Sequence, residues 1–532
     1  MAFPGCGVLR MTTPSRTRRF VESVGLGYLQ TACVTLVGLW LAPFLIGRLG
    51  QEHYGLWLVG MQVLGYLALL DFGIIALLPR EVAHATGTGR GDLTAPAAVF
   101  RTASGLVRWQ LPLVLLAAAV AWLALPRTWA DVSGPLGLAF LVFAALFPFR
   151  LYQAALQGLQ DLRYLGGLQF AAWAFGTLVT VVLVLGGAGL FSLAIGWAIG
   201  QGILVGGARL RLLRRFPELL TRAQSAMSGM ARSYLGNSFW VSLSQVAQVL
   251  LSGSDLLILG WLVGPAALVP YACTTKLVLV LANQPGLLVN AALPAVSEAR
   301  GRGDTQRLIA IASAISQATL VLSGLIACAV LIANSWFVSW WVGPGLYAGL
   351  RVTGMAAAVM VLRHLNVTFA KVLFGLGMQR ATSLVGIADG TVTVLLSWLL
   401  VPRMGVVGAL AGQAIAVCLI SLPLQGFLIG RVLGTPAQEY FRHTALLVAQ
   451  LAVPCILAAL AAWLTPATDV WAVSFQLACL LVLYAAVAGR LAIRPPLRPW
   501  FDRAVTALAA RESAPARAFG RLLQRLPHPR HP

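Results

Sequence analysis

The stretch "GYLALLDFGIIALLPREV" (Gly65 to Val82) places one carboxylate inside an apolar run. Its first fourteen residues would be an ordinary membrane-spanning segment but for Asp71. An ionised carboxylate in hydrocarbon is costly, and such residues mostly face a protein interior or a water-filled cavity. The stretch therefore predicts a membrane helix with a polar partner or a functional site beside it.

Composition extends this prediction to the whole chain. Of its 532 residues, 59% are hydrophobic and only 10% are charged, whereas soluble domains carry roughly 25% charged residues. Apolar runs of about 20 residues, separated by short polar stretches, predict many transmembrane helices. Barrel strands would be shorter and alternating. The expected fold class is an all-α polytopic membrane protein.

Fourteen runs have spanning length, and the eighth, with Pro285 and Pro294, is expected to be kinked. The expected spans are 21–46, 54–78, 104–125, 134–156, 164–186, 189–208, 236–263, 265–297, 309–333, 350–374, 381–401, 405–430, 443–464 and 469–489.

The net charge of +22 comes almost entirely from Arg, since Lys276 and Lys371 are the only lysines. Most of these arginines lie between apolar runs on one side, which the positive-inside rule makes cytoplasmic. The outer side receives only Arg48, Arg127, Arg351 and Arg403. We therefore expect a multi-pass membrane protein with both termini in the cytoplasm. Without a soluble basic face, no nucleic-acid partner is expected.

The seven cysteines lie mostly within apolar runs and are interpreted as buried hydrophobic residues, so neither a disulfide frame, a metal site nor a cofactor is expected. In the tail, Arg517, Arg521 and Arg525 share one helical face opposite apolar residues. This spacing is typical of an amphipathic helix on the inner leaflet; a disordered basic tail is the alternative.

An internal repeat relates the first six spans to the next six. "TGRGD" (88–92) matches "RGRGD" (300–304) at an offset of 212, and "GLQDLR" (158–163) matches "GLGMQR" (375–380) at 217. "GLFSLAIGWAI" (189–199) matches "GVVGALAGQAI" (405–415) at 216. Because six is even, the repeat is parallel, and transporters built in this way place the substrate between the halves.

The expected domains follow from the spans and the repeat. They are a basic cytoplasmic N-terminus (1–20), a first lobe (21–208), a basic linker (209–235), a second lobe (236–430), two further helices (431–490) and a basic cytoplasmic tail (491–532).

Three carboxylates, Asp71, Asp255 and Asp389, lie within spans and are candidates for coupling or gating, with a proton or sodium as the coupling ion. The alternatives are a buried structural ion pair or, at Asp71, a cap at a local break helped by Gly73. Asp255 lies about 12 Å and Lys276 about 17 Å below the outer ends of neighbouring spans, so a contact between them is expected.

The cationic candidates are Arg150, Lys276, Arg363 and Lys371. Arg363 and Lys371 are eight residues apart and share a helix face. The repeat relates Arg150 to Val367 on the same face, and Arg150 is also an expected partner of Asp71. Together these cations would line a central cavity suited to a diphosphate, whose oxygens Arg binds in bidentate fashion. His364, adjacent to Arg363, is interpreted as a packing residue.

Two segments carry a resemblance to a known family. "YGLWLVGMQVLGYLALLDFGIIALLPREVAHATGTGRGD" (54–92) resembles the second-helix segment of the Wzx-type polysaccharide flippases, which belong to the multidrug/oligosaccharidyl-lipid/polysaccharide (MOP) exporter superfamily. "SDLLILGWLVGPAALVPYACTTKLV" (254–278) resembles their helix 7–8 segment. The fourteen spans and the six-plus-six repeat are also similar to this family.

The resemblance implies two six-helix lobes that flip a polyprenyl-diphosphate-linked oligosaccharide by alternating access, for surface polysaccharide biosynthesis. The implied location is the bacterial cytoplasmic (inner) membrane. The implied partners are this glycolipid, membrane lipids and polysaccharide assembly machinery. The family's cationic cavity would correspond to Arg150, Lys276, Arg363 and Lys371.

Other functions remain as alternatives. A lipid II-type flippase shares the helix number and a basic cavity, but its charge pattern in the first two helices is absent here. A multidrug exporter takes cationic drugs, which a cationic cavity would repel. An enzyme such as an O-antigen polymerase or ligase would need a large outer loop, and the longest here, 334–349, carries no charge. A scaffold would have no use for buried charges.

Overall fold

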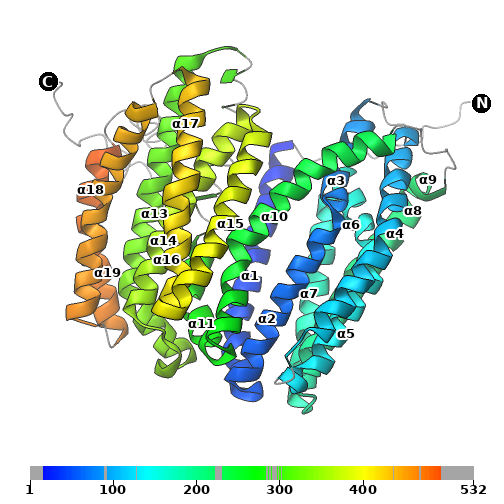
Figure 1. Ribbon diagram of the computed structural model, residues 1–532, viewed down its shortest axis with the longest axis horizontal. Helices are drawn as coiled ribbons and strands as arrows, with labels where there is room; N and C mark the ends of the chain where they lie inside the picture. Colours follow the sequence, from blue (N-terminus) through cyan, green and yellow to red (C-terminus); the bar gives the residue numbers. More distant parts are fainter. Residues whose placement is uncertain are drawn as a thin grey trace, which may run out of the picture. The chain divides into compact units, whose positions relative to one another are not determined.

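The computed structural model describes residues 16–88, 93–126, 129–221, 230–282, 285–286, 289, 296, 299–300, 302–434, 437–466 and 469–492 (Figure 1). All regular elements of these ranges are helical. The amphipathic helix predicted in the tail lies outside the described residues, as do residues 222–229 of the predicted linker 209–235 and Pro294 of the predicted kink.

The described helices follow the predicted spans in order. Twelve are long and apolar enough to cross a membrane. A bent pair, Ala231–Leu251 and Gly253–Leu262, lies at the seventh predicted span, and a shorter apolar helix, Pro265–Leu281, begins the eighth. The predicted class, an all-α polytopic membrane protein, is confirmed.

The chain forms two compact units. Unit 1 comprises Met1–Arg48, Ile75–Leu111 and Gly137–Ala231. Unit 2 comprises Leu49–Ile74, Pro112–Leu136 and Arg232–Pro532. The lobe boundaries 21–208 and 236–430 stay a prediction.

In unit 1, the central feature is a close helix pair, α7 (Leu162–Leu185) and α8 (Phe191–Arg215). Small residues let the two backbones approach. A Cβ added to Gly196 would lie 2.6 Å from the carbonyl oxygen of Gly176, and one on Gly200 would lie 3.0 Å from that of Ala172. Small residues are the usual basis of tight helix packing in membranes, where lipid supplies little hydrophobic drive.

Unit 2 contains a similar pair, α15 (Gln379–Met404) and α16 (Val406–Ala416). A Cβ on Gly412 would lie 2.6 Å from the Ser397 hydroxyl oxygen, and one on Gly408 would lie 2.6 Å from the Leu400 carbonyl oxygen. Gly412 follows Gly196 by 216 residues, the offset of the predicted repeat. The same close approach therefore recurs in both halves of the repeat.

Backbone dihedrals at the turns support the repeat independently. Gly189 and Gly405 have φ of 55° and 59°, and Gln160 and Gly377 have φ of 61° and 77°. These pairs lie 216 and 217 residues apart. Left-handed φ is uncommon, and at Gln160 it occurs in a non-glycine residue. Corresponding turns thus have the same handedness, and the parallel repeat is a property of the backbone as well as of the sequence.

The longest helix, α13 (Thr305–Val342), is the centre of the apolar core of unit 2. It packs against α14 (Leu350–Gly375), α18 (Ala437–Leu464) and α19 (Val470–Ala492), and the last two lie beside it in Figure 1. On α19, Trp471 and Phe475 are 81% and 71% exposed. Such apolar exposure fits a surface that faces lipid.

Candidate functional site

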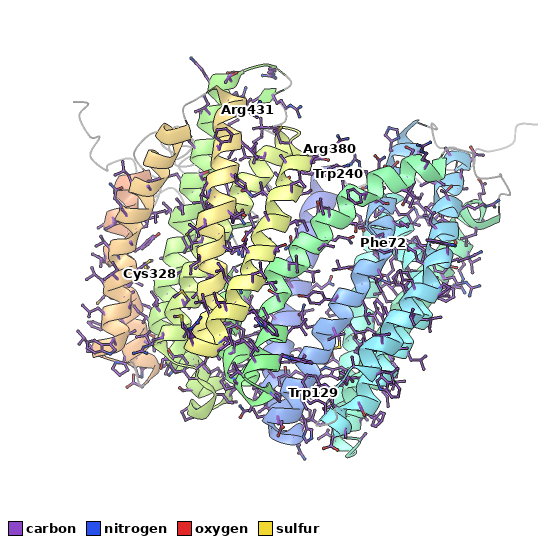
Figure 2. All side chains as sticks on the ribbon, in the orientation of Figure 1. Phe72, Trp129, Trp240, Cys328, Arg380 and Arg431 are labelled. Carbon is purple, nitrogen blue, oxygen red and sulfur yellow. The ribbon has the colours of Figure 1, made fainter. Side chains whose placement is uncertain are left out.

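The predicted span 54–78 is not one continuous helix. Helix α2 (Gln51–Leu67) passes into a 3-10 turn, η1 (Ala68–Asp71), and α3 (Ile74–Thr88) begins three residues later. Phe72, labelled in Figure 2, has φ of 46°, and Gly73 has φ of 73°. The reason is tertiary, because α10 (Met230–Leu262) approaches closely here. A Cβ on Gly73 would lie 2.4 Å from the carbonyl oxygen of Ser238.

Asp71 is 2% exposed and lies at this break. Its Oδ1 accepts a hydrogen bond from the Gly73 N–H at 2.9 Å. Beside it, the Tyr234 hydroxyl of α10 donates to the carbonyl oxygen of Ile74 at 2.8 Å. The carboxylate therefore caps a local break, which is the alternative that the sequence left open for it. A coupling or gating role for Asp71 stays a prediction.

Arg150 also lies at a helix break, in unit 1. The 3-10 turn η3 (Phe147–Arg150) separates α5 (Ala130–Leu146) from α6 (Leu151–Gly158). Its guanidinium carbon lies 5.7 Å from the centroid of the Phe143 ring, a cation–π arrangement. Asp71, its predicted partner, belongs to unit 2, so that pairing stays a prediction.

The predicted contact between Asp255 and Lys276 does not form. Instead, the Tyr271 hydroxyl of α11 (Pro265–Leu281) donates to Asp255 Oδ2, and the Leu256 N–H donates to Oδ1 at 2.9 Å. Helix geometry explains the difference. Tyr271 precedes Lys276 by five residues, which places the two side chains on different faces of α11.

Lys276 is half-buried on a helix of a membrane-spanning protein. Among the described residues, no carboxylate forms an ion pair with it. An ammonium without a counter-charge in such a place is costly. A substrate-binding role for Lys276 stays a prediction.

Arg363 and Asp389, predicted for different roles, form a buried ion pair. Arg363 on α14 donates from Nη1 to Asp389 Oδ2 on α15 at 2.6 Å. Its Nη2 donates to the Thr393 hydroxyl at 3.2 Å. The Asp389 side chain has no exposed area, and that of Arg363 is 16% exposed.

Three uncharged donors complete the surroundings of Asp389. Ser421 donates to Oδ2 at 2.6 Å and Asn366 at 3.4 Å, while Thr393 donates to Oδ1 at 3.3 Å. Ser421 ends a π-helical turn, η5 (Val417–Ser421), between α16 and α17 (Leu422–Leu433). Such turns inside α-helices frequently mark functional sites.

Lys371 lies on the same face of α14 as Arg363, with Val367 between them at 41% exposure. The cationic face predicted from the spacing therefore reaches the surface of unit 2. His364 points elsewhere. Its Nδ1 lies 2.7 Å from the Ser323 hydroxyl, and its Nε2 donates to the Ala282 carbonyl oxygen at 2.8 Å, since a carbonyl only accepts. These contacts fit the packing role expected for it.

The predicted site residues thus fall into separate places: the break at Asp71, the Asp255–Tyr271 pair, and the Arg363–Asp389 pair. Sequence reasoning missed Tyr271, Asn366, Thr393 and Ser421. Helical spacing could have indicated two of them, since Asn366 follows Arg363 by three residues and Thr393 follows Asp389 by four. No cluster of three or more metal-ligating side chains occurs within the described ranges.

Known proteins were compared with this chain by sequence and by structure. No protein-family model and no curated protein matches the sequence. The structure is similar to "Lipid II flippase MurJ, inward closed conformation", with a TM-score of 0.61 and 10% identity, over 88% of this chain and 100% of that one. It is also similar to an inward-facing multidrug resistance MATE family transporter of the MOP superfamily, with a TM-score of 0.57 and 14% identity. This match covers 75% of this chain and 95% of that one.

The chain shares its fold with these two solved structures. At these low identities the likeness concerns the fold alone. The chain is a multi-pass membrane protein.

Proposed function

We propose that this protein is a flippase that moves a polyprenyl-diphosphate-linked oligosaccharide from the cytoplasmic to the outer leaflet by alternating access, for surface polysaccharide biosynthesis. It would work in the bacterial inner membrane with both termini in the cytoplasm. The MOP fold supports a transporter, and a solved structure of this fold is a lipid II flippase.

The observation that carries the proposal is Lys276. Its ammonium has no carboxylate partner within the described part of the chain, whereas the carboxylate expected beside it is held by Tyr271. A diphosphate carries the missing negative charge. With Arg150, Arg363 and Lys371, Lys276 would form the cationic lining that binds this group.

The remaining parts of the proposal concern coupling and partners. Asp71, Asp255 and Asp389 are the candidates for coupling to a proton or sodium gradient, because ionisable residues in membrane helices commonly mark ion pathways. Polysaccharide assembly machinery would receive the flipped glycolipid.

The decisive experiment is lipid analysis of a strain that lacks the gene. We expect mass spectrometry to show accumulated polyprenyl-diphosphate oligosaccharide together with loss of the exported polymer. Complementation with Lys276→Ala should leave the glycolipid accumulated, whereas Lys276→Arg, which keeps the positive charge, should restore at least half of the export. Arg351→Ala removes an exposed cation at the predicted outer end of α14 and is the matched control.

Unchanged glycolipids in the deletion strain would contradict the proposal. A second candidate is a lipid II-type flippase, which the similarity to MurJ favours. The same experiment separates the two, because lipid II would then accumulate and growth would fail. A cationic-drug exporter would leave both glycolipids at their normal levels.

A further inference from the structure

The Arg363–Asp389 pair has a feature that stability alone does not explain. Burying two charges costs desolvation energy that their attraction often fails to repay, so such a pair is weak evidence for a stabilising role. Asp389 nevertheless receives one charged and three uncharged hydrogen bonds from α14, α15 and the π-turn η5. Three elements thus converge on one carboxylate.

The surroundings of Asp389 reduce the cost of releasing the guanidinium. If the Arg363 guanidinium moves away, Asp389 keeps its hydrogen bonds from Ser421, Asn366 and Thr393. The carboxylate therefore still has three hydrogen-bond donors. The guanidinium is itself incompletely bound. Its Nε–H is buried and has no hydrogen-bond partner.

The direction of departure follows from α14. Arg363 shares its helix face with Val367, which is 41% exposed, and with Lys371 one turn further. A rotation of the Arg363 side chain along this face brings the guanidinium towards a second cation. Arg363 and Lys371 lie about 12 Å apart along this face. Two cations on one helix face suit an anion with several oxygens, and Arg binds carboxylates and phosphates with the same planar donors.

We propose that Asp389 is the positioning residue of Arg363: it holds the guanidinium inside unit 2 in the absence of substrate and releases it to a diphosphate group when substrate arrives. This inference rests on the proposed function. No covalent step is involved, because one ion pair replaces another. The π-turn that carries Ser421 keeps Asp389 in place during the exchange.

The test measures binding of inorganic pyrophosphate to the purified full-length protein by calorimetry. Asp389→Asn removes the competing charge with little change in shape, and we expect it to tighten binding by about tenfold. Arg363→Ala should weaken binding at least tenfold, and Asp389→Asn should then have no further effect in that background. A merely structural role for Asp389 does not predict tighter binding.

Asp161→Asn is the matched control, because it removes another carboxylate that pairs with an arginine, Arg211 in unit 1, outside the candidate site. Its affinity should equal that of the parent. Thr393→Val offers a second route that keeps every charge. It removes the Nη2 partner of Arg363 and should tighten binding about threefold, less than Asp389→Asn.

Several results would overturn the inference. Unchanged or weaker binding by folded Asp389→Asn and Thr393→Val proteins would do so, as would equal tightening by Asp161→Asn, which would indicate a general charge effect. Binding that depends on Lys276 but not on Arg363 would remove the exchange and leave the flippase proposal intact. If the parent does not bind pyrophosphate at all, both proposals are wrong.

Discussion

Asp71 and Gly73 form a local side chain to backbone hydrogen bond that the sequence indicates. Asp side chains often accept a hydrogen bond from the backbone two residues on, and the bond from Gly73 N–H to Asp71 Oδ1 is of this kind. The left-handed φ angles of Phe72 and Gly73, in contrast, are not indicated by the sequence. They accompany the close approach of α10 at Ser238, which no local pattern in the sequence indicates.

The first prediction separates the charge of Asp71 from its hydrogen bond. Asp71→Asn keeps an oxygen that accepts from Gly73 but removes the charge. If the charge acts in coupling, transport should fall about tenfold, equivalent to about 1.4 kcal/mol, while the amount of protein in the membrane stays normal. Glycolipid export and immunoblots of membranes measure the two quantities.

Asp71→Ala is the comparison, because it leaves the buried Gly73 N–H without its acceptor at a cost of about 1–3 kcal/mol. We expect a lower membrane level for this variant. Equal loss of protein in both variants would show that the carboxylate is structural only.

At the scale of elements, α18 and α19 show how helices outside the repeat attach to unit 2. Both pack on α13, where Tyr484 of α19 donates to the Val321 carbonyl oxygen and Cys455 of α18 lies 3.3 Å, sulfur to sulfur, from Cys328. Cys328 is labelled in Figure 2. The sequence places both cysteines in apolar runs but does not pair them, because 127 residues separate them.

This packing predicts a site-specific cross-link. A small rotation brings the two sulfurs to the roughly 2.05 Å of a disulfide, so a thiol oxidant such as diamide should join Cys328 to Cys455 in the purified protein. Peptide mass spectrometry should detect this pair. Cys455→Ser should abolish it without creating a cross-link between Cys328 and Cys273. Failure of the parent to cross-link would contradict the packing of α18 on α13.

At the scale of the whole molecule, arginine asymmetry and helix order predict the topology. Inner-end arginines also make local contacts. Arg211 bonds to Asp161 at 2.8 Å in unit 1, and the guanidinium carbon of Arg380 lies 5.2 Å from the Trp240 ring in unit 2, where Figure 2 labels both residues. Their distribution along the chain, rather than any one contact, predicts the orientation.

A pair of cysteine reporters on the two ends of α13 tests this orientation. Gly345→Cys lies just beyond the predicted outer end, where an added Cβ meets no neighbour, and Gln306→Cys lies at the exposed inner end. In intact cells, a membrane-impermeant maleimide should label only Gly345→Cys. Gln306→Cys should react after permeabilisation. The parent chain measures the background from its own cysteines, and the reverse pattern would mean that the termini lie outside.

The sequence by itself determined the helical class, the order of the helices, the repeat and the set of intramembrane charges. These depend on local composition and on periodicity, which each segment carries alone. Tertiary structure decided which charges meet. Asp255 pairs with Tyr271 rather than Lys276, and Asp389 lies between Arg363 and Ser421, because helix rotation and packing bring distant residues together. A sequence indicates how deep a charge lies in the membrane, but the neighbour that compensates it depends on how the helices pack.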